Sequence, residues 1–272
     1  DGFKKNRADV VSRCIECGIN YIDACTRAET LAYSAALKGR RDKMYLGYSW
    51  YEHELRNPKF RTCDALLQCL DEGLKSCGLD YVDVWRITMH EQSGKHTPGE
   101  VEQMMKALDR AREQGKARFT GFSSHDRPHI KSLIEAYPKT VQVVVTPYTA
   151  KSKELPKDSL FETVQKAGVG VFGIKPYASG SLFKGDGTVG NPHAERDNEN
   201  ARLALRYILC NPAIAAPIPG MINTAQVDNA VKAVQERRTL DLTEKAQLDQ
   251  AMEEAWAKLP ANYQWLKDWE WV

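Results

Sequence analysis

The stretch "GINYIDACTRAETLAYSAALKGRRDKMYLGYSW", residues 18–50, decides the fold class, because it holds one complete strand–helix–strand unit. Two short runs, 19–23 and 44–49, are rich in β-forming residues, and the segment between them, about 29–38, has a helical pattern. Each run is apolar on both alternate faces, which is typical of a parallel strand buried on two sides. The unit therefore predicts an α/β fold built on a parallel sheet.

The same alternation continues almost to the end of the chain. Further strand-like runs lie at 82–87, 119–124, 141–148, 169–176 and 214–220. Further helical patterns lie at about 62–77, 99–114, 127–136, 157–167, 198–210 and 224–236. A helix at about 4–17 opens the chain without a strand before it, and another, at about 243–257, lies outside the alternation.

Seven strands are one fewer than a (β/α)8 TIM barrel needs. A parallel barrel of seven strands would leave unpaired edges, and a helix opens this chain where a strand is expected. We therefore predict an α/β fold of the (β/α)8 TIM barrel type whose first strand is missing from this chain. A doubly wound open sheet is the alternative, but no G-x-G-x-x-G follows an early strand.

We expect residues 1–272 to form a single domain, a barrel with an extra C-terminal helix and an aromatic tail. The length is ordinary for one α/β barrel. The tail carries Trp265, Trp269 and Trp271. This spacing is consistent with packing over the barrel mouth, onto the barrel wall or against a partner subunit. A homo-oligomer is therefore left open.

The composition argues against two classes of partner. The formal net charge is +2 and no basic run stands out, so we expect no nucleic acid. No apolar stretch approaches the roughly 20 residues of a membrane span, so we expect no membrane contact. We predict a cytoplasmic location, while noting that a trimmed exported precursor would begin in the same way at Asp1.

The seven cysteines do not indicate a disulfide framework, because their number is odd and they are not dense. Cys14 and Cys17 form a C-x-x-C, which we interpret as one turn of an amphipathic helix running into Gly18. We also predict no metal site, because no spacing typical of metal ligands occurs around His96, His125, His129 and His193.

With the strands placed, the sequence resembles the aldo-keto reductase family over roughly residues 8–236. The resemblance rests on seven fragments that occur in the family's order. They are "GINYID" (18–23), "ALKGRRDKMYLGYSW" (36–50), "LDYVDVWRITMHE" (79–91), "GKARFTGFSSHD" (115–126), "VQVVVTPY" (141–148), "GVGVFGIKPYASGSL" (168–182) and "ILCNPAIAAPIPGMINTAQVDNAV" (208–231). Each fragment is weak alone, but together they support the barrel fold.

The resemblance implies a catalytic tetrad, of which this chain keeps one member. In the family a Tyr donates a proton to the substrate carbonyl, a Lys and an Asp lower the pKa of that Tyr, and a His orients the substrate. Asp23 stands in the Asp position. The Tyr position is Ala28, or Thr26 if the loop is two residues shorter. The Lys position is Ser49 and the His position is Thr88.

Other groups near these positions are candidates for the acid–base chemistry. We predict that Asp23 and His90 are catalytic, because His90 follows a strand end on the catalytic face and imidazole titrates near neutrality, with a pKa of about 6.5. A surface histidine and an aspartate that only caps a helix or pairs with a basic residue are the alternatives. Tyr48 is expected to pack in the barrel wall, and nothing favours a thiolate at Cys25.

The nucleotide-binding positions are better kept, so the resemblance implies NADP or NAD as cofactor. It places the nicotinamide amide at a Ser-Asn pair and a Gln, and the pyrophosphate and adenosine at two later turns. The predicted cofactor-binding residues are Ser123, Ser124, Gln142, Ile174, Lys175, Ser179, Gly180, Leu182, Gly220, Met221, Gln226 and Asn229. The Arg often found in the adenosine turn is absent, so the choice between NAD and NADP stays open.

Three functions are consistent with these residues. The first, which we favour, is an NAD(P)-dependent oxidoreductase acting on a small carbonyl or alcohol substrate with an altered acid–base set. The second is a catalytically inactive barrel that binds a nucleotide or another ligand. The third is a barrel enzyme repurposed for non-redox chemistry. Fold alone does not decide between them.

Overall fold

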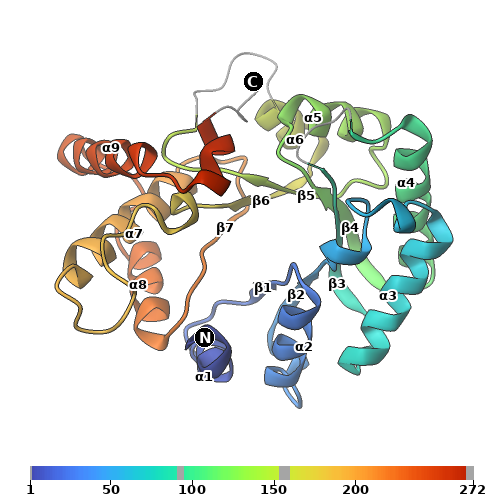
Figure 1. Cartoon of the computed structure of the whole chain (residues 1–272), viewed down its shortest axis with the longest axis horizontal. Coiled ribbons are helices and arrows are strands. Elements are labelled where there is room, and N and C mark those ends of the chain that lie inside the picture. Colours follow the sequence, from blue (N-terminus) through green and yellow to red (C-terminus); the bar gives the residue numbers. More distant parts are fainter. Residues whose placement is uncertain (1, 91–94, 153–159, 268–272) are drawn as a thin grey trace.

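The computed structural model describes residues 2–90, 95–152 and 160–267. Seven parallel strands form one sheet in the order β1-β2-β3-β4-β5-β6-β7, and the sheet curls into a nearly closed barrel with helices around it (Figure 1). The strands are β1 (Tyr21–Asp23), β2 (Tyr45–Tyr48), β3 (Val82–Thr88), β4 (Ala117–Ser123), β5 (Val143–Pro147), β6 (Gly170–Ile174) and β7 (Ala216–Ile218). The predicted α/β barrel is therefore confirmed.

Helices connect the strands on the outside of the barrel. They are α1 (Gly2–Glu16), α2 (Arg27–Ala36), α3 (Cys63–Cys77), α4 (Pro98–Glu113), α5 (Arg127–Ala136), α6 (Leu160–Ala167), α7 (Ala194–Leu209), α8 (Thr224–Gln235) and α9 (Leu242–Ala257). The short 3-10 segment η2 (Tyr51–His53) follows β2, η5 (Ala178–Gly180) follows β6, and η6 (Ala261–Lys267) follows α9. None of the helices in these ranges is long and apolar enough to cross a membrane.

The two edge strands, β1 and β7, are shorter than predicted. The runs 19–23 and 214–220 form ladders only over Tyr21–Asp23 and Ala216–Ile218, because each edge strand has a hydrogen-bonded neighbour on one side only. Helix α1 links the two edges on the outside: Val10 and Val11 pack in one cluster with Leu37 beside α2 and Val227 of α8. The blue and orange helices at the bottom of Figure 1 show this arrangement.

The helices begin where the sequence supplies N-cap residues. The side chain of Thr26 accepts a hydrogen bond from the backbone N–H of Glu29, whose carboxylate binds the N–H of Thr26 in return, which completes a capping box before α2. Thr97 and Glu100 repeat this arrangement before α4. Each such cap stabilises its helix by about 1 kcal/mol. Helix α2 therefore starts at a defined point directly after the end of β1.

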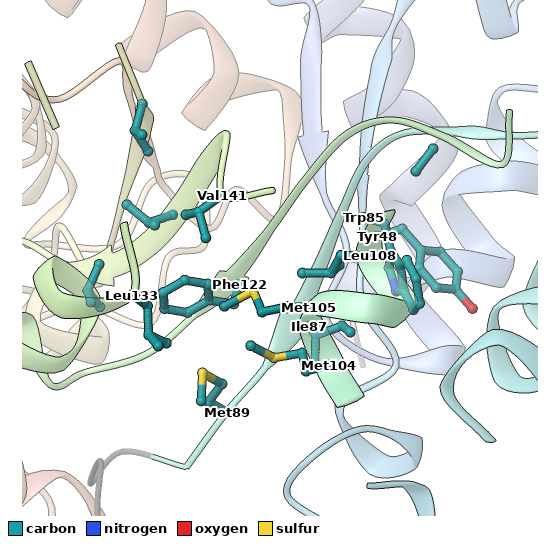
Figure 2. Close-up of a cluster of buried hydrophobic side chains, with 14 of the residues drawn as sticks. Tyr48, Trp85, Ile87, Met89, Met104, Met105, Leu108, Phe122, Leu133 and Val141 are labelled. Atoms are coloured by element: carbon teal, nitrogen blue, oxygen red, sulfur yellow. The ribbon is translucent and has the colours of Figure 1, made fainter. Parts of the chain in front are cut away.

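The largest apolar core lies between the strands and the helices rather than inside the barrel. Figure 2 shows this layer at α4, where Trp85 and Ile87 of β3 and Phe122 of β4 meet Met104 and Leu108. Strand residues alternate between this layer and the barrel interior. The residues between these apolar positions, such as Arg86 and Thr88, therefore face the interior.

Tyr48 belongs to the outer layer, as predicted from its strand position. Its ring is fully buried, and its hydroxyl lies so close to α3 that a Cβ at Gly73 would be 1.8 Å from it. Inside the barrel, Tyr21 stacks on Phe172 with ring centroids 4.2 Å apart. Gly47 leaves room for Tyr21, since a Cβ there would be 2.0 Å from the phenol oxygen.

The close approach of β4 and β5 yields a test of the barrel packing. A Cβ at Gly121 would lie 1.7 Å from the carbonyl oxygen of Val143, a backbone atom that cannot rotate away. We expect Gly121→Ala to lower the free energy of unfolding by about 1–3 kcal/mol or more, measured by urea denaturation. Gly99 has no atom within 4 Å of a Cβ, so Gly99→Ala should be neutral or stabilising by up to about 1 kcal/mol. Equal effects of the two variants would contradict the packing described.

Candidate active site

Asp23 at the end of β1 is held by Arg86 of β3. The Nε of Arg86 donates to Oδ1 of Asp23 at 2.9 Å, and its Nη2 donates to Oδ2. The two side chains are only 6% and 3% exposed, so the pair is almost fully desolvated. Burial acts to lower the pKa of Arg86, but the charge and hydrogen bond of Asp23, together with Cys25 and Tyr21, outweigh it and keep that pKa well above its usual range. The site therefore holds a fixed positive charge beside a carboxylate.

A phenol lies next to this ion pair, but it is not in the loop where the family places its Tyr. The hydroxyl of Tyr21 donates to Oδ1 of Asp23 at 3.1 Å, from two residues earlier on the same strand. Burial, followed by the negative charge of Asp23, raises the pKa of Tyr21 well above its usual value. Thr26, by contrast, caps α2, and Ala28 lies in the first turn of that helix. Tyr21 is thus a neutral phenol inside the barrel.

A second polar cluster lies around Ser49 and Thr88, the two residues that the sequence resemblance aligned with the family's Lys and His. The hydroxyls of Ser49 and Thr88 are 2.8 Å apart, and Ser49 also lies 2.6 Å from Oε2 of Glu54. The backbone N–H of Thr88 donates to Glu54 at 2.8 Å, and that of Trp50 at 3.0 Å. Burial raises the pKa of Glu54. Arg86 joins the two clusters, because its Nη1 donates to Oγ1 of Thr88 at 3.3 Å.

Cys25 lies at the edge of these clusters, two residues after Asp23. Burial raises the pKa of its thiol, and the positive charge of Arg86 offsets this only in part. The neutral thiol is therefore the favoured form of Cys25.

His90 follows the end of β3 and is half-buried. Its backbone N–H donates to Nε2 of His96 at 3.0 Å, and the two rings are 5.1 Å apart. Burial, and then the positive charge of Arg61, lowers the pKa of His96 to about 4. His96 is therefore a neutral hydrogen-bond acceptor that holds the backbone of His90 in place.

The residues predicted to bind the nicotinamide amide are only partly brought together. Ser123 ends β4 and pairs in register with Thr88, so it lies beside the second cluster. Ser124 follows it, and its hydroxyl accepts from the N–H of Asp126 at 3.2 Å. Gln142 lies beside Thr120, three residues or about 10 Å before Ser123 along the strand, and its amide oxygen accepts from the N–H of Thr120.

The loop after β6 has the features of a phosphate-binding turn. Ile174 ends β6, and left-handed φ angles occur at Lys175, Ala178, Ser179 and Gly180. The backbone N–H groups of Ala178, Gly180, Ser181 and Leu182 donate to carbonyls within this loop. Within the described part of the chain, the buried hydroxyls of Ser179 and Ser181 have no hydrogen-bond partner. The two hydroxyls are therefore the groups of this loop that a phosphate could contact, and buried Leu182 anchors its far end.

At the predicted adenosine turn, the side-chain amides of Gln226 and Asn229 form hydrogen bonds within the protein. Gln226 accepts from the N–H of Ile222 at 2.9 Å. Asn229 accepts from Arg202 at 2.8 Å and donates to the carbonyl of Asn198 at 2.9 Å, which ties α8 to α7. Gly220 and Met221 form the turn that leads from β7 into α8. Gln226 and Asn229 therefore shape the turn through these internal hydrogen bonds.

The C-terminal segment lies across the carboxyl ends of β4 and β6. Trp265 of η6 stacks on His125, just after Ser124, with ring centroids 4.3 Å apart. The Nζ of Lys175 lies 5.1 Å from the ring centroid of Tyr263. The red segment at the top of Figure 1 shows this placement. The aromatic tail thus begins over the barrel mouth, while Trp269 and Trp271 lie outside the described residues.

Three residues of the site were not identified from the sequence. Arg86 had a detectable signal, since a charged residue in the buried run 82–88, on the same face as Thr88, requires an acidic partner. Tyr21 also had one, because strand alternation places it on the same face as Asp23. Glu54 had none, because it lies in an irregular loop after η2.

Comparisons with known proteins agree with the barrel fold. A sequence model of the aldo/keto reductase family matches residues 4–253. An uncharacterized oxidoreductase of Schizosaccharomyces pombe is 23% identical over 77% of this chain and 73% of its own length. An L-glyceraldehyde 3-phosphate reductase of Escherichia coli is 26% identical over a match that covers 68% of this chain and 62% of that enzyme. An aldo-keto reductase of Bacillus halodurans in its holo form superposes with a TM-score of 0.68 at 20% identity, covering 91% of this chain and 87% of its own.

The buried ion pair generates a stability prediction. Asp23→Asn or Arg86→Met leaves one charge buried without its partner, so each should lower the free energy of unfolding by about 3–5 kcal/mol. The double variant should lose clearly less than the sum, as measured by urea denaturation in a double-mutant cycle. The exposed pair Arg110–Asp64, at 2.8 Å, is the control and should show little or no coupling, because solvent screens it. Additive losses at Asp23 and Arg86 would contradict the pairing.

The environment of His96 generates a prediction about pH. Because its folded-state pKa is about 4, the unfolded chain takes up a proton first as the pH falls below about 6.5. We therefore expect the free energy of unfolding to fall between about pH 6.5 and 4, and His96→Gln to remove this component. NMR titration should show the ring of His96 neutral at pH 5. The exposed His193 is the control, and a loss of the same component in His193→Gln would contradict the assignment.

Proposed function

Because the chain belongs to the aldo/keto reductase family, we propose that it is an NAD(P)-dependent oxidoreductase with an altered acid–base set, acting on a small carbonyl or alcohol substrate. The observation that carries the proposal is the pair formed by Asp23 and Arg86 at the carboxyl ends of the strands. TIM-barrel enzymes place their active sites at this end. Here a lysine is absent from its family position, yet the carboxylate still has a buried cation beside it.

The dinucleotide would lie along the carboxyl ends of the later strands. Ser123, Ser124 and Ile174 would hold the nicotinamide end, and the loop with Ser179 and Gly180 would hold the pyrophosphate. When bound, the cofactor supplies or accepts a hydride. The chain's own groups would supply orientation, exclusion of water and a proton. Trp265 and Tyr263 over the mouth would help to exclude water.

Asp23 and His90 are the proposed catalytic residues, with different roles. Asp23 accepts hydrogen bonds from Arg86 and Tyr21. Its role would be to hold the guanidinium of Arg86 where negative charge develops on the substrate oxygen. His90 lies just beyond β3 and is half-buried, so it is placed to exchange a proton at the mouth. The exposed hydroxyl-bearing and basic groups on the outer helices have no part in the proposal.

Dinucleotide binding is the direct test of this function. We expect NADPH or NADH to quench the tryptophan fluorescence in a saturable titration, and a panel of small carbonyl compounds to be reduced. The double variant Ser179→Ala/Ser181→Ala should weaken dinucleotide binding at least about tenfold, because hydrogen bonds to a charged phosphate are lost. Ser132→Ala on the exposed face of α5 is the control and should have no effect.

The outcomes separate the candidate functions. Absence of saturable binding to the unaltered protein would refute the proposal. Tight binding without turnover over the whole panel would favour a binding protein instead. That second candidate has a specific observation in its favour, since neither Ser49 nor Thr88 can replace the lysine or histidine directly.

A further inference from the structure

A chain of buried hydrogen-bonding groups connects Glu54 to the carboxyl end of β3. We propose that Glu54 is held as a neutral carboxylic acid and delivers a proton to the substrate oxygen through the hydroxyls of Ser49 and Thr88. This inference rests on the proposed reductase function, since it supplies the proton that the missing tyrosine would have donated. It makes Thr88 the catalytic group that meets the substrate, and Glu54 and Ser49 its proton source.

The contacts form a continuous path. Oε2 of Glu54 lies 2.6 Å from the hydroxyl of Ser49, which lies 2.8 Å from the hydroxyl of Thr88. Each hydroxyl can accept one proton as it gives up another, because it has both a donor and acceptor sites. Glu54, Ser49 and Thr88 are 3%, 0% and 7% exposed, so water does not interrupt the path and the most exposed group is at its outer end.

The charges around Glu54 favour its protonated form. Two carboxylates and one guanidinium are buried here, and Arg86 makes its paired contact with Asp23. Among the residues described, no lysine, arginine or histidine lies within ion-pair distance of Glu54, whose partners are Ser49 and the N–H groups of Thr88 and Trp50. Burying a second, unpaired carboxylate costs several kcal/mol, so protonation is favoured.

The other titratable groups around Glu54 do not change this balance. Burial is the largest effect and raises the pKa of Glu54. The hydrogen bonds that Ser49 and the N–H groups of Thr88 and Trp50 donate to it, and then the charge of Arg86, lower that pKa only in part. The negative charge of an ionised Glu54 would also act on three neighbouring titratable groups, Cys25, Tyr48 and Cys69. Burial raises the pKa of each of these three groups, that of Cys69 to about 11, so they are neutral near pH 7. Arg86 is thus the sole charge that favours ionised Glu54 among these groups.

The outer end of the path lies where a substrate would be reduced. Thr88 pairs in register with Ser123, the residue proposed to hold the nicotinamide amide. Nη1 of Arg86 donates to Oγ1 of Thr88 at 3.3 Å, which leaves the hydroxyl hydrogen of Thr88 to point at Ser49 or at a substrate oxygen. The same guanidinium would stabilise negative charge on that oxygen.

The proton balance of the step is complete. The O–H bond of Thr88 breaks as an O–H bond forms on the substrate oxygen. Thr88 takes the proton of Ser49, Ser49 takes that of Glu54, and Glu54 is left as a carboxylate that is reprotonated from solvent before the next turnover. The electron pair that reduces the carbonyl carbon comes from the reduced nicotinamide dinucleotide of the proposed function, and the chain contributes the proton alone.

The protonation state is tested first, without cofactor or substrate. Infrared spectroscopy of the unliganded protein at pH 7 should show the carbonyl band of a protonated carboxylic acid. The band should be lost in Glu54→Gln and kept in Glu52→Gln, an exposed carboxylate on the same loop. Absence of the band from the folded, unaltered protein, or its survival in Glu54→Gln, would overturn the inference whether or not the protein is a reductase.

Folding stability gives a second measurement on the same variants. Because a raised folded-state pKa means that the folded protein holds the proton longer than the unfolded chain, Glu54 loses stabilising effect as the pH rises above about 4.3. Glutamine mimics the protonated acid, so Glu54→Gln should unfold at the same or a higher denaturant concentration than the unaltered protein at pH 7. A marked loss of stability, as expected for removal of a needed carboxylate, would overturn the inference.

Turnover tests the path itself once a substrate is reduced. Glu54→Gln and Thr88→Val should each lower kcat for reduction at least about a hundredfold with little change in KM, and Glu54→Asp should restore part of it. The unaltered enzyme should lose rate as the pH rises, and Glu54→Gln should not. Ser132→Ala, on the exposed face of α5, is the control and should retain the full rate. Full activity in Thr88→Val or in Glu54→Gln would overturn the path and leave the reductase function standing.

Discussion

The arrangement of this barrel interior depends on one ion pair, formed by Asp23 at the end of β1 and Arg86 on β3. A carboxylate this deeply buried requires a cation of matching geometry, and the planar guanidinium provides two parallel hydrogen bonds. Tyr21 adds a third hydrogen bond and stacks on Phe172 across the barrel. The pair therefore orders the aromatic packing beneath it as well as the charge at the mouth.

The same guanidinium explains how the family's lysine and histidine positions can be occupied by Ser49 and Thr88. The positive charge enters from β3, so the space beside it is filled by two hydroxyls that bind each other and Glu54. A neutral hydroxyl pair adds no charge to a cluster that Asp23 already balances. The cation at Arg86 thus balances Asp23 without a second cation on the neighbouring strand.

The fold was predictable to a large extent, and the site only in part. Short apolar runs alternating with capped helices identify parallel strands and their order, because these patterns are local. The burial of Tyr48 followed from strand alternation in the same way. The partner of Asp23 did not, since it lies 63 residues away, and neither did the internal hydrogen bonds of Gln142, Gln226 and Asn229, which depend on neighbouring strands and helices.

The sequence by itself determined the barrel, the place of Asp23 at a strand end and the family to which the chain is similar. Hydrophobic periodicity and the order of motifs can be read along the chain without knowledge of the tertiary contacts. Only the tertiary structure decided that Arg86 neutralises Asp23, that Ser49 and Thr88 meet Glu54, and that Trp265 covers the mouth beside His125. The physical reason is that hydrogen bonds and ion pairs in a barrel join residues on different strands and loops. Their distance in space is set by how the strands pair and has no counterpart in their distance along the chain.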